Sequence, residues 1–144
     1  MIRVTRRYRF SASHRLHTLS LNDAENQALY GKCNNPFGHG HNYVVAVSVR
    51  GPVDPQTGRA VNTETMDKLV QRLAVEAFDR RNLNSEIPEF GDLVPTTENL
   101  GLEIHRRLSS EWQRVFPGGV PALEKVRIAE TERNIFEIES DESK

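Results

Sequence analysis

Apolar and polar side chains alternate along two stretches of the chain, and this period of two predicts strands that each bury one face. The first stretch covers residues 2–10, and the second covers residues 42–50, where β-branched residues dominate. The next segment, GPVDPQTGRAV, is rich in proline and glycine, so we expect a hairpin connection into a third strand around residues 60–61. Alternation returns over residues 125–128 and 135–138, which predicts a closing hairpin.

The apolar period changes to three and four residues in two other stretches, which predicts helices. A single amphipathic helix is expected over residues 63–82, with an apolar face made of Met66, Leu69, Val70, Leu73, Ala77 and Phe78. A second long helix is expected to start at Thr96 or Thr97, either of which is a competent N-cap, and to end near residue 116. Its apolar residues recur in steps of four: Leu100, Ile104, Leu108 and Trp112.

This order of elements predicts an α+β fold, an antiparallel four-stranded sheet with two helices covering one face. The other face would carry four arginines among small and polar groups: Arg3, Arg7, Arg50 and Arg127. Such a sheet also leaves two open edges, which assembly of several copies into a ring would close. With 144 residues, we expect a single domain over residues 1–144, with a frayed charged tail at residues 140–144.

The composition narrows the classes of partner. Nineteen Lys and Arg residues against twenty Asp and Glu residues leave a net charge of -1, so no general attraction to nucleic acid is expected. No apolar run approaches the roughly 20 residues that span a bilayer. The N-terminal segment MIRVTRRYRF places arginines where a secretion signal needs apolar residues. We therefore expect a cytoplasmic protein without a membrane partner.

Three histidines suggest a metal site. His39 and His41 are two residues apart at the entrance to the second predicted strand, so both side chains would point to the same face. His14, at the far end of the first strand, can supply a third nitrogen if the two strand ends are neighbours. Three histidines with one open position are the typical ligand set of catalytic zinc. Surface histidines near a glycine turn are the plainer interpretation, and the addition of His14 favours the metal.

The only cysteine, Cys33, lies six residues before His39 and has three interpretations. It can complete a closed structural site with three histidines, which would leave no open position for substrate. It can be a thiolate beside a dication, where the positive charge lowers its pKa and makes it a base or nucleophile. It can also be a buried and inert side chain.

Two carboxylates and several other polar residues are further candidates. Asp79, in FDRRNLN, can simply cap the helix or pair with a neighbouring arginine. Glu130, in IAETE, lies where a strand meets a turn, and a carboxylate there can accept two parallel N–H bonds from a guanidine-like ring edge. An ordinary strand-end glutamate is the default until a ligand is named. The remaining residues need only a structural role: Thr96, Thr97, His17 and His105.

Five motifs together resemble the family of 6-pyruvoyltetrahydropterin synthase and 6-carboxytetrahydropterin synthase: FSASHRL, GKCNNPFGHGHNY, GPVDPQTG, PTTENL and the late ET. They occur in the family's order with near-family spacing over nearly the whole chain. The resemblance implies the T-fold, in which antiparallel sheets join through their edges into trimer barrels and two trimers form a hexamer. It also implies a pocket between subunits.

The resemblance further implies roles for particular residues. Zinc would be held by His14, His39 and His41, with side-chain oxygens of the substrate entering the open position. Glu130 and the segment Thr96 to Thr97 would hold a pterin ring. The implied substrate is 7,8-dihydroneopterin triphosphate, which loses triphosphate while its side chain undergoes an internal redox rearrangement without nicotinamide. In this scheme Cys33 is the catalytic base, and Asp79 belongs to a second proton-handling unit.

The chain departs from the family pattern at Arg80, where the family commonly has a histidine paired with the aspartate. A guanidinium does not titrate near neutral pH, so it cannot shuttle a proton as imidazole does. Three outcomes are open. Cys33 and zinc can suffice for catalysis with lower turnover, or a histidine of a neighbouring subunit, such as His17 or His105, can replace the missing imidazole. The chain can also catalyse a different reaction. Arg80 can also bind a substrate phosphate.

Three functions compete on these residues. Five residues separate Cys33 from His39, and this spacing resembles the pyruvoyl type rather than the carboxy type of deazapurine and queuosine biosynthesis. A pterin-binding zinc protein impaired in catalysis is the alternative that Arg80 motivates. A structural metalloprotein, with Cys33 closing the site, is the third.

Overall fold

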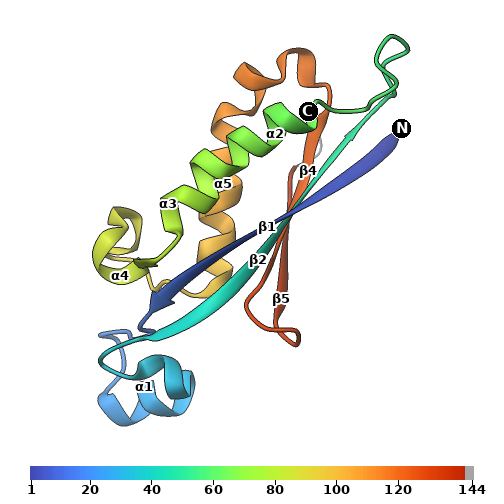
Figure 1. Cartoon of the computed structure of the whole chain (residues 1–144). Helices are drawn as coiled ribbons and strands as arrows, with labels where there is room; N and C mark the ends of the chain where they lie inside the picture. Colours follow the sequence, from blue (N-terminus) through green and yellow to red (C-terminus); the bar gives the residue numbers. More distant parts are fainter. Residues whose placement is uncertain (142–144) are drawn as a thin grey trace.

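The structure is a computed structural model that describes residues 1–141, so residues 142–144 of the predicted tail lie outside the described part. One sheet has the strand order β3-β1-β2-β4-β5 (Figure 1). Its four long strands are antiparallel neighbours: β1 (Ile2–His14), β2 (His39–Gly51), β4 (Ala122–Ala129) and β5 (Ile135–Glu139). They form the predicted four-stranded antiparallel sheet, and the two-residue β3 (Arg81–Asn82) adds a parallel pairing beside β1.

The pairing of β1 with β2 sets the two faces of the sheet. It runs without interruption from Ile2 opposite Gly51 to His14 opposite His39. Even-numbered residues of β1 and odd-numbered residues of β2 therefore face the helices, as the alternation in the sequence predicted. The opposite, open face carries the four expected arginines: Arg3 opposite Arg50, and Arg7 and Arg127 on either side of Ala46.

The first predicted helix is shorter than expected. It consists of α2 (Thr63–Val70), a π-helical turn at residues 71–75 and α3 (Glu76–Phe78) in direct succession. The prediction that it reaches residue 82 is wrong, because Asp79 is extended and Arg80 has a left-handed backbone with φ of 59°. After this turn the chain runs beside the end of β1 and pairs with it as β3.

The second predicted helix is confirmed as α5 (Thr97–Val115), with Thr96 as its N-cap. The predicted third strand around residues 60–61 is wrong, because β2 ends at Gly51 and both residues 60 and 61 lie in bends. The prediction also missed α1 (Asp23–Tyr30), whose capping box of Asn22 and Glu25 is a readable start signal. The other short helices are Gly31–Asn34, α4 (Leu83–Glu86), Pro88–Phe90 and Pro117–Gly119.

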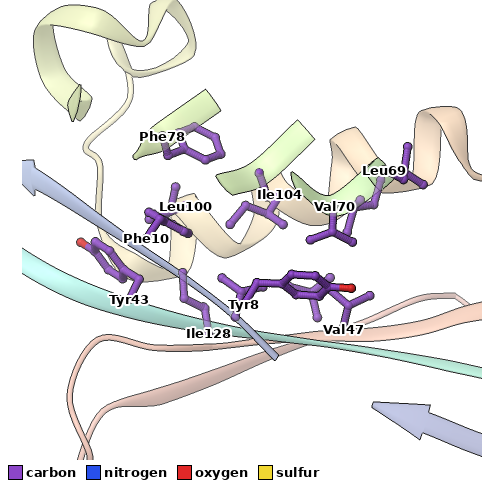
Figure 2. Packing of buried hydrophobic residues seen from close by; sticks show 14 of the residues in the cluster. Tyr8, Phe10, Tyr43, Val47, Leu69, Val70, Phe78, Leu100, Ile104 and Ile128 are labelled. Atoms are coloured by element: carbon purple, nitrogen blue, oxygen red, sulfur yellow. The ribbon is translucent and has the colours of Figure 1, made fainter. Parts of the chain in front are cut away.

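The hydrophobic core lies between the sheet and the layer formed by α2, α3 and α5 (Figures 1 and 2). Phe10 and Tyr43 stack across β1 and β2 with ring centroids 5.3 Å apart, and Phe78 of α3 packs against Phe10. Helix α5 contributes Leu100 and Ile104, both fully buried. This core holds the helix layer against the sheet and thereby fixes where α5 begins.

The long connection between β1 and β2 is fastened to the end of β1. The buried Asn26 side chain donates to the carbonyls of Thr18, Leu21 and Asn22 and accepts from the Thr18 backbone N–H. The Leu16 N–H donates to the Cys33 carbonyl over 2.7 Å. These bonds place Cys33 near the end of β1. Within residues 1–141, no helix combines the length and the apolar character needed to cross a bilayer.

His105 connects α5 to the residue that follows β5, and we predict that the burial of its ring makes stability pH-dependent. Its Nε2 lies 2.8 Å from Ser140 Oγ, and burial lowers the pKa of His105. The folded protein thus favours the neutral ring, so its contribution is present above about pH 6.5 and is lost as pH falls through the lowered pKa. Urea denaturation between about pH 8 and pH 5 should show a smaller loss of unfolding free energy in His105→Gln than in the wild type. Equal losses in both proteins would contradict the prediction.

Candidate metal and substrate site

Four side chains meet at the end of the sheet where β1 finishes and β2 begins. They are His14, Cys33, His41 and Glu130, and one nitrogen, sulfur or oxygen atom of each lies within 4.8 Å of those of the others. His14 ends β1, Cys33 lies in the short helix before β2, His41 is in β2, and Glu130 directly follows β4. Residues far apart in the sequence thus form one group, which we call the His-Cys-Glu group.

Hydrogen bonds orient the two imidazoles. His14 Nδ1 donates to the Pro95 carbonyl over 2.8 Å, which leaves Nε2 without a proton and directed into the group. The two Nε2 atoms of His14 and His41 lie 3.1 Å apart, and His41 Nε2 lies 2.9 Å from Glu130 Oε1. Imidazole, thiolate and carboxylate are the ligands that zinc takes in proteins, so the donor set fits such an ion.

The charge states of the group also suit a cation. Burial lowers the pKa of His14, which keeps its ring neutral. The hydrogen bond from His41 lowers the pKa of Glu130, which keeps that carboxylate ionised. Burial, followed by the charge of Glu130, raises the pKa of the Cys33 thiol. In the single chain, the ionised Glu130 carboxylate therefore disfavours a second negative charge on the Cys33 sulfur. A bound cation would offset that repulsion.

His39 lies outside the His-Cys-Glu group. Its ring is 4.7 Å from that of His41 between centroids, and its side chain is exposed at the first residue of β2. It lines a cavity of about 420 Å³ together with Lys32 and Asn35. The structure thus brings together two of the three histidines predicted as metal ligands, and it places Cys33 and Glu130 beside them.

The two threonines at the start of α5 differ in their partners. Thr96 Oγ1 accepts the backbone N–H of Asn99 over 3.1 Å, which is the expected N-cap bond. Thr97 is 3% exposed, and its Oγ1 has no hydrogen-bond partner among the described residues. A buried hydroxyl without a partner costs about 1–3 kcal/mol, so it is a natural place for a ligand group. Because Pro95 also contacts His14, this end of α5 borders the group.

Asp79 and Arg80 lie at a different place, beside β1. Asp79 Oδ1 accepts the Ser11 backbone N–H over 2.9 Å, and the Arg80 N–H donates to the Ser11 carbonyl. Neither residue belongs to the His-Cys-Glu group of its own chain.

Two groups that lie beside His14 were not predicted from the sequence. The hydroxyl of Tyr43 lies 3.4 Å from His14 Nδ1, and the carbonyl of Pro95 orients the same ring. Alternation indicated only a buried strand residue at Tyr43. A backbone carbonyl such as that of Pro95 leaves no signal in the sequence.

The fold and the site together define the class of protein. It is a T-fold protein, in which an antiparallel sheet is covered by helices on one face and side chains suited to bind a metal ion meet at the strand ends. The model of the 6-pyruvoyl tetrahydropterin synthase family matches residues 3–141. The chain therefore belongs to this family, as the motifs indicated.

Individual relatives agree with this assignment. The human 6-pyruvoyl tetrahydrobiopterin synthase is 47% identical over 132 residues, which cover 92% of this chain and 87% of the relative. The protein of that name from Poecilia reticulata is 45% identical over 132 residues, covering 92% and 86%. The structure of Caenorhabditis elegans 6-pyruvoyl tetrahydropterin synthase superposes with a TM-score of 0.83 at 38% identity, covering 97% of this chain and 96% of that one.

The unequal bonding of the two threonines predicts opposite effects of the same substitution. Thr96→Val removes the N-cap bond and should cost about 0.5–2 kcal/mol of unfolding free energy. Thr97→Val removes a buried hydroxyl that has no partner, so it should leave the unfolding free energy unchanged or raise it. Chemical denaturation of both variants measures the difference. A Thr97→Val variant as destabilised as Thr96→Val would show that the Thr97 hydroxyl serves the fold.

Proposed function

We propose that the chain is a zinc-dependent lyase that converts 7,8-dihydroneopterin triphosphate to 6-pyruvoyltetrahydropterin with loss of triphosphate. The convergence of His14, Cys33, His41 and Glu130 at one end of the sheet carries this proposal. In the overall reaction, triphosphate leaves, the side-chain carbons are oxidised and the dihydropterin ring is reduced. The redox change is internal, so no external oxidant or reductant is needed. The pyruvoyl names of the relatives support this product over 6-carboxytetrahydropterin.

His14, His39 and His41 would hold the zinc. The Pro95 bond prepares His14 Nε2 as a ligand, and the ring of His39 already lies beside that of His41. When bound, the ion supplies Lewis-acid polarisation of the substrate's side-chain oxygens, which acidifies the adjacent C–H bond.

Cys33 is the proposed base. Its Sγ lies 3.8 Å from His41 Nε2, close enough to the proposed ligands to feel the charge of a cation. The pKa of the thiol is raised in the chain alone, so the thiolate needs the positive charge of the loaded site. This dependence couples removal of the substrate proton to the presence of the metal.

Glu130 and the segment Thr96 to Thr97 are the proposed contacts of the pterin ring. Once His41 Nε2 is a metal ligand, the ionised Glu130 carboxylate is free to accept two N–H bonds from the guanidine-like edge of the ring. The unpartnered hydroxyl of Thr97 can bond a further polar atom of the ring.

The proposal includes a homohexamer built as a dimer of trimers, as the resemblance implies. Two open edges support it: within residues 1–141, β5 ends the sheet and β1 has an outer partner only at Ala12 and Ser13. Backbone groups along such edges pair readily with another copy. In an assembly of this kind, Asp79 would serve the His-Cys-Glu group of a neighbouring copy as its second catalytic residue.

Product analysis tests the proposed reaction. Zinc-loaded protein should convert 7,8-dihydroneopterin triphosphate to 6-pyruvoyltetrahydropterin and triphosphate, as identified by mass spectrometry, and Arg80→His should be assayed alongside. Release of 6-carboxytetrahydropterin and acetaldehyde as the sole products would contradict the pyruvoyl reaction. A silent wild type with activity only in Arg80→His would instead establish an impaired pterin-binding protein.

Two substitutions separate the ligand from the base. Cys33→Ala should keep the zinc, as measured by metal content after gel filtration, and should lower kcat by roughly 10²–10⁴-fold, as expected for a lost general base. His39→Ala should lower zinc affinity by more than the roughly 10–100-fold typical of an outer contact. If Cys33→Ala loses the zinc while His39→Ala keeps it, Cys33 is a ligand in a closed site.

A further inference from the structure

A second cavity lies at the same end of the sheet but on its open face. Its volume is about 460 Å³, and its lining includes Ser11, Ser13, Gly40, Asn42, Arg80 and Arg81. Ser11 pairs with Asn42, and Ser13 pairs with Gly40, across β1 and β2. Because side chains alternate along a strand, these residues face away from the helices, whereas His14 and His41 face toward them. Ala12 and His41 also contribute to the lining, so at the end of the sheet this cavity borders the His-Cys-Glu group of the same chain.

Two guanidinium groups in this lining have no carboxylate partner among residues 1–141. Arg80 and Arg81 make no ion pair there. Two carboxylates nearby are engaged with the backbone instead: Asp79 accepts the Ser11 N–H, and Glu86, which also lines the cavity, accepts the Asn82 N–H over 2.6 Å. Two adjacent guanidinium groups and one carboxylate that is bonded to the backbone thus border one cavity.

The backbone of Arg80 is held in a conformation that L-residues adopt at a cost. Its φ is 59°, and its N–H donates to the Ser11 carbonyl over 2.5 Å. A glycine would adopt this conformation with less strain. Because this bond uses only the backbone, the fold does not require the guanidinium of Arg80.

Neutral donors accompany the arginines. Ser11 Oγ donates to Asn42 Oδ1 over 2.5 Å, which orients the Asn42 amide so that its N–H donors remain available. Ser13 adds a hydroxyl to the lining. Guanidinium groups bind phosphate oxygens in pairs of parallel hydrogen bonds, and hydroxyl and amide groups supply the remaining donors.

We propose that Arg80 and Arg81, with Asn42 and Ser13, form a binding site for a polyphosphate chain. The identity of the ligand rests on the proposed function, because that reaction offers two sources of this chemistry. One is the triphosphate of a substrate whose pterin end occupies the His-Cys-Glu group of a neighbouring copy. The other is the free triphosphate that the reaction releases.

Titration calorimetry with inorganic tripolyphosphate tests the site without substrate or metal. Chelator-treated wild-type protein should bind it, and Arg80→Gln and Arg81→Gln should each weaken binding about 10-fold or more, the size expected for a lost charge-assisted contact. Arg114→Gln is the matched control, because it removes the same charge from an exposed position near the end of α5 and should change affinity less than about 2-fold. Absence of wild-type binding, or equal weakening in the control, would overturn the proposal.

Arg80→Gly distinguishes a binding role from a structural one. Glycine relieves the left-handed backbone, so this variant should be at least as stable as the wild type in thermal denaturation and still lose affinity as Arg80→Gln does. Full affinity in a folded Arg80→Gly variant would overturn the role of its guanidinium.

The source of the polyphosphate follows from a comparison of three ligands in zinc-loaded Cys33→Ala protein, in which turnover should be slowed roughly 10²–10⁴-fold. If Arg80→Gln in this background weakens binding of 7,8-dihydroneopterin triphosphate but not of 7,8-dihydroneopterin, the site holds the substrate chain. If it weakens binding of tripolyphosphate alone, the site holds the released product. Both patterns support the polyphosphate site. The calorimetric result on tripolyphosphate stands even if the proposed turnover fails.

Discussion

The pairing of β1 with β2 is the constraint on which the rest of the structure depends. Both strands are 13 residues long and remain in register to their ends, so His14 at the end of one strand lies beside the start of the other. A shift by one residue would turn His41 to the open face and Tyr43 out of the core. The stacking of Tyr43 on Phe10 resists such a shift, which means that core packing and site geometry are stabilised by the same contacts.

The His-Cys-Glu group is assembled by elements that the core positions. Helix α5 packs on the sheet through Leu100 and Ile104, and this packing places Pro95 against the His14 ring. Glu130 reaches His41 because β4 pairs with β2 up to Ala129. The site is therefore built on rigid strands and a helix start, with only Cys33 supplied by the long connection. Groups held this way keep their orientation when a metal or substrate binds.

The end of the first helical segment connects the two faces of the sheet. Asp79 and Arg80 stop the helix and attach the chain to the Ser11 backbone, so β3 forms beside β1. This local arrangement turns two arginines toward the open face, at the same end of the sheet as the His-Cys-Glu group on the other face. In a ring of copies joined edge to edge, both faces of one sheet can then contribute to sites shared between neighbours.

The sequence by itself determined the elements whose signals are local. The alternation of residues 42–50, the helix that begins after Thr96 and the two histidines on one face of β2 depend on near neighbours in the chain, so their patterns could be recognised directly. The motifs likewise identified the family. Only the tertiary structure decided that Glu130 and Cys33 join His14 and His41 while His39 stays at the edge. It also decided that the helix stops at Phe78 and that Arg80 faces a cavity. These outcomes depend on hydrogen bonds between residues distant in the sequence, such as those of Asp79 and Arg80 to Ser11, and such contacts leave no periodic pattern in the chain.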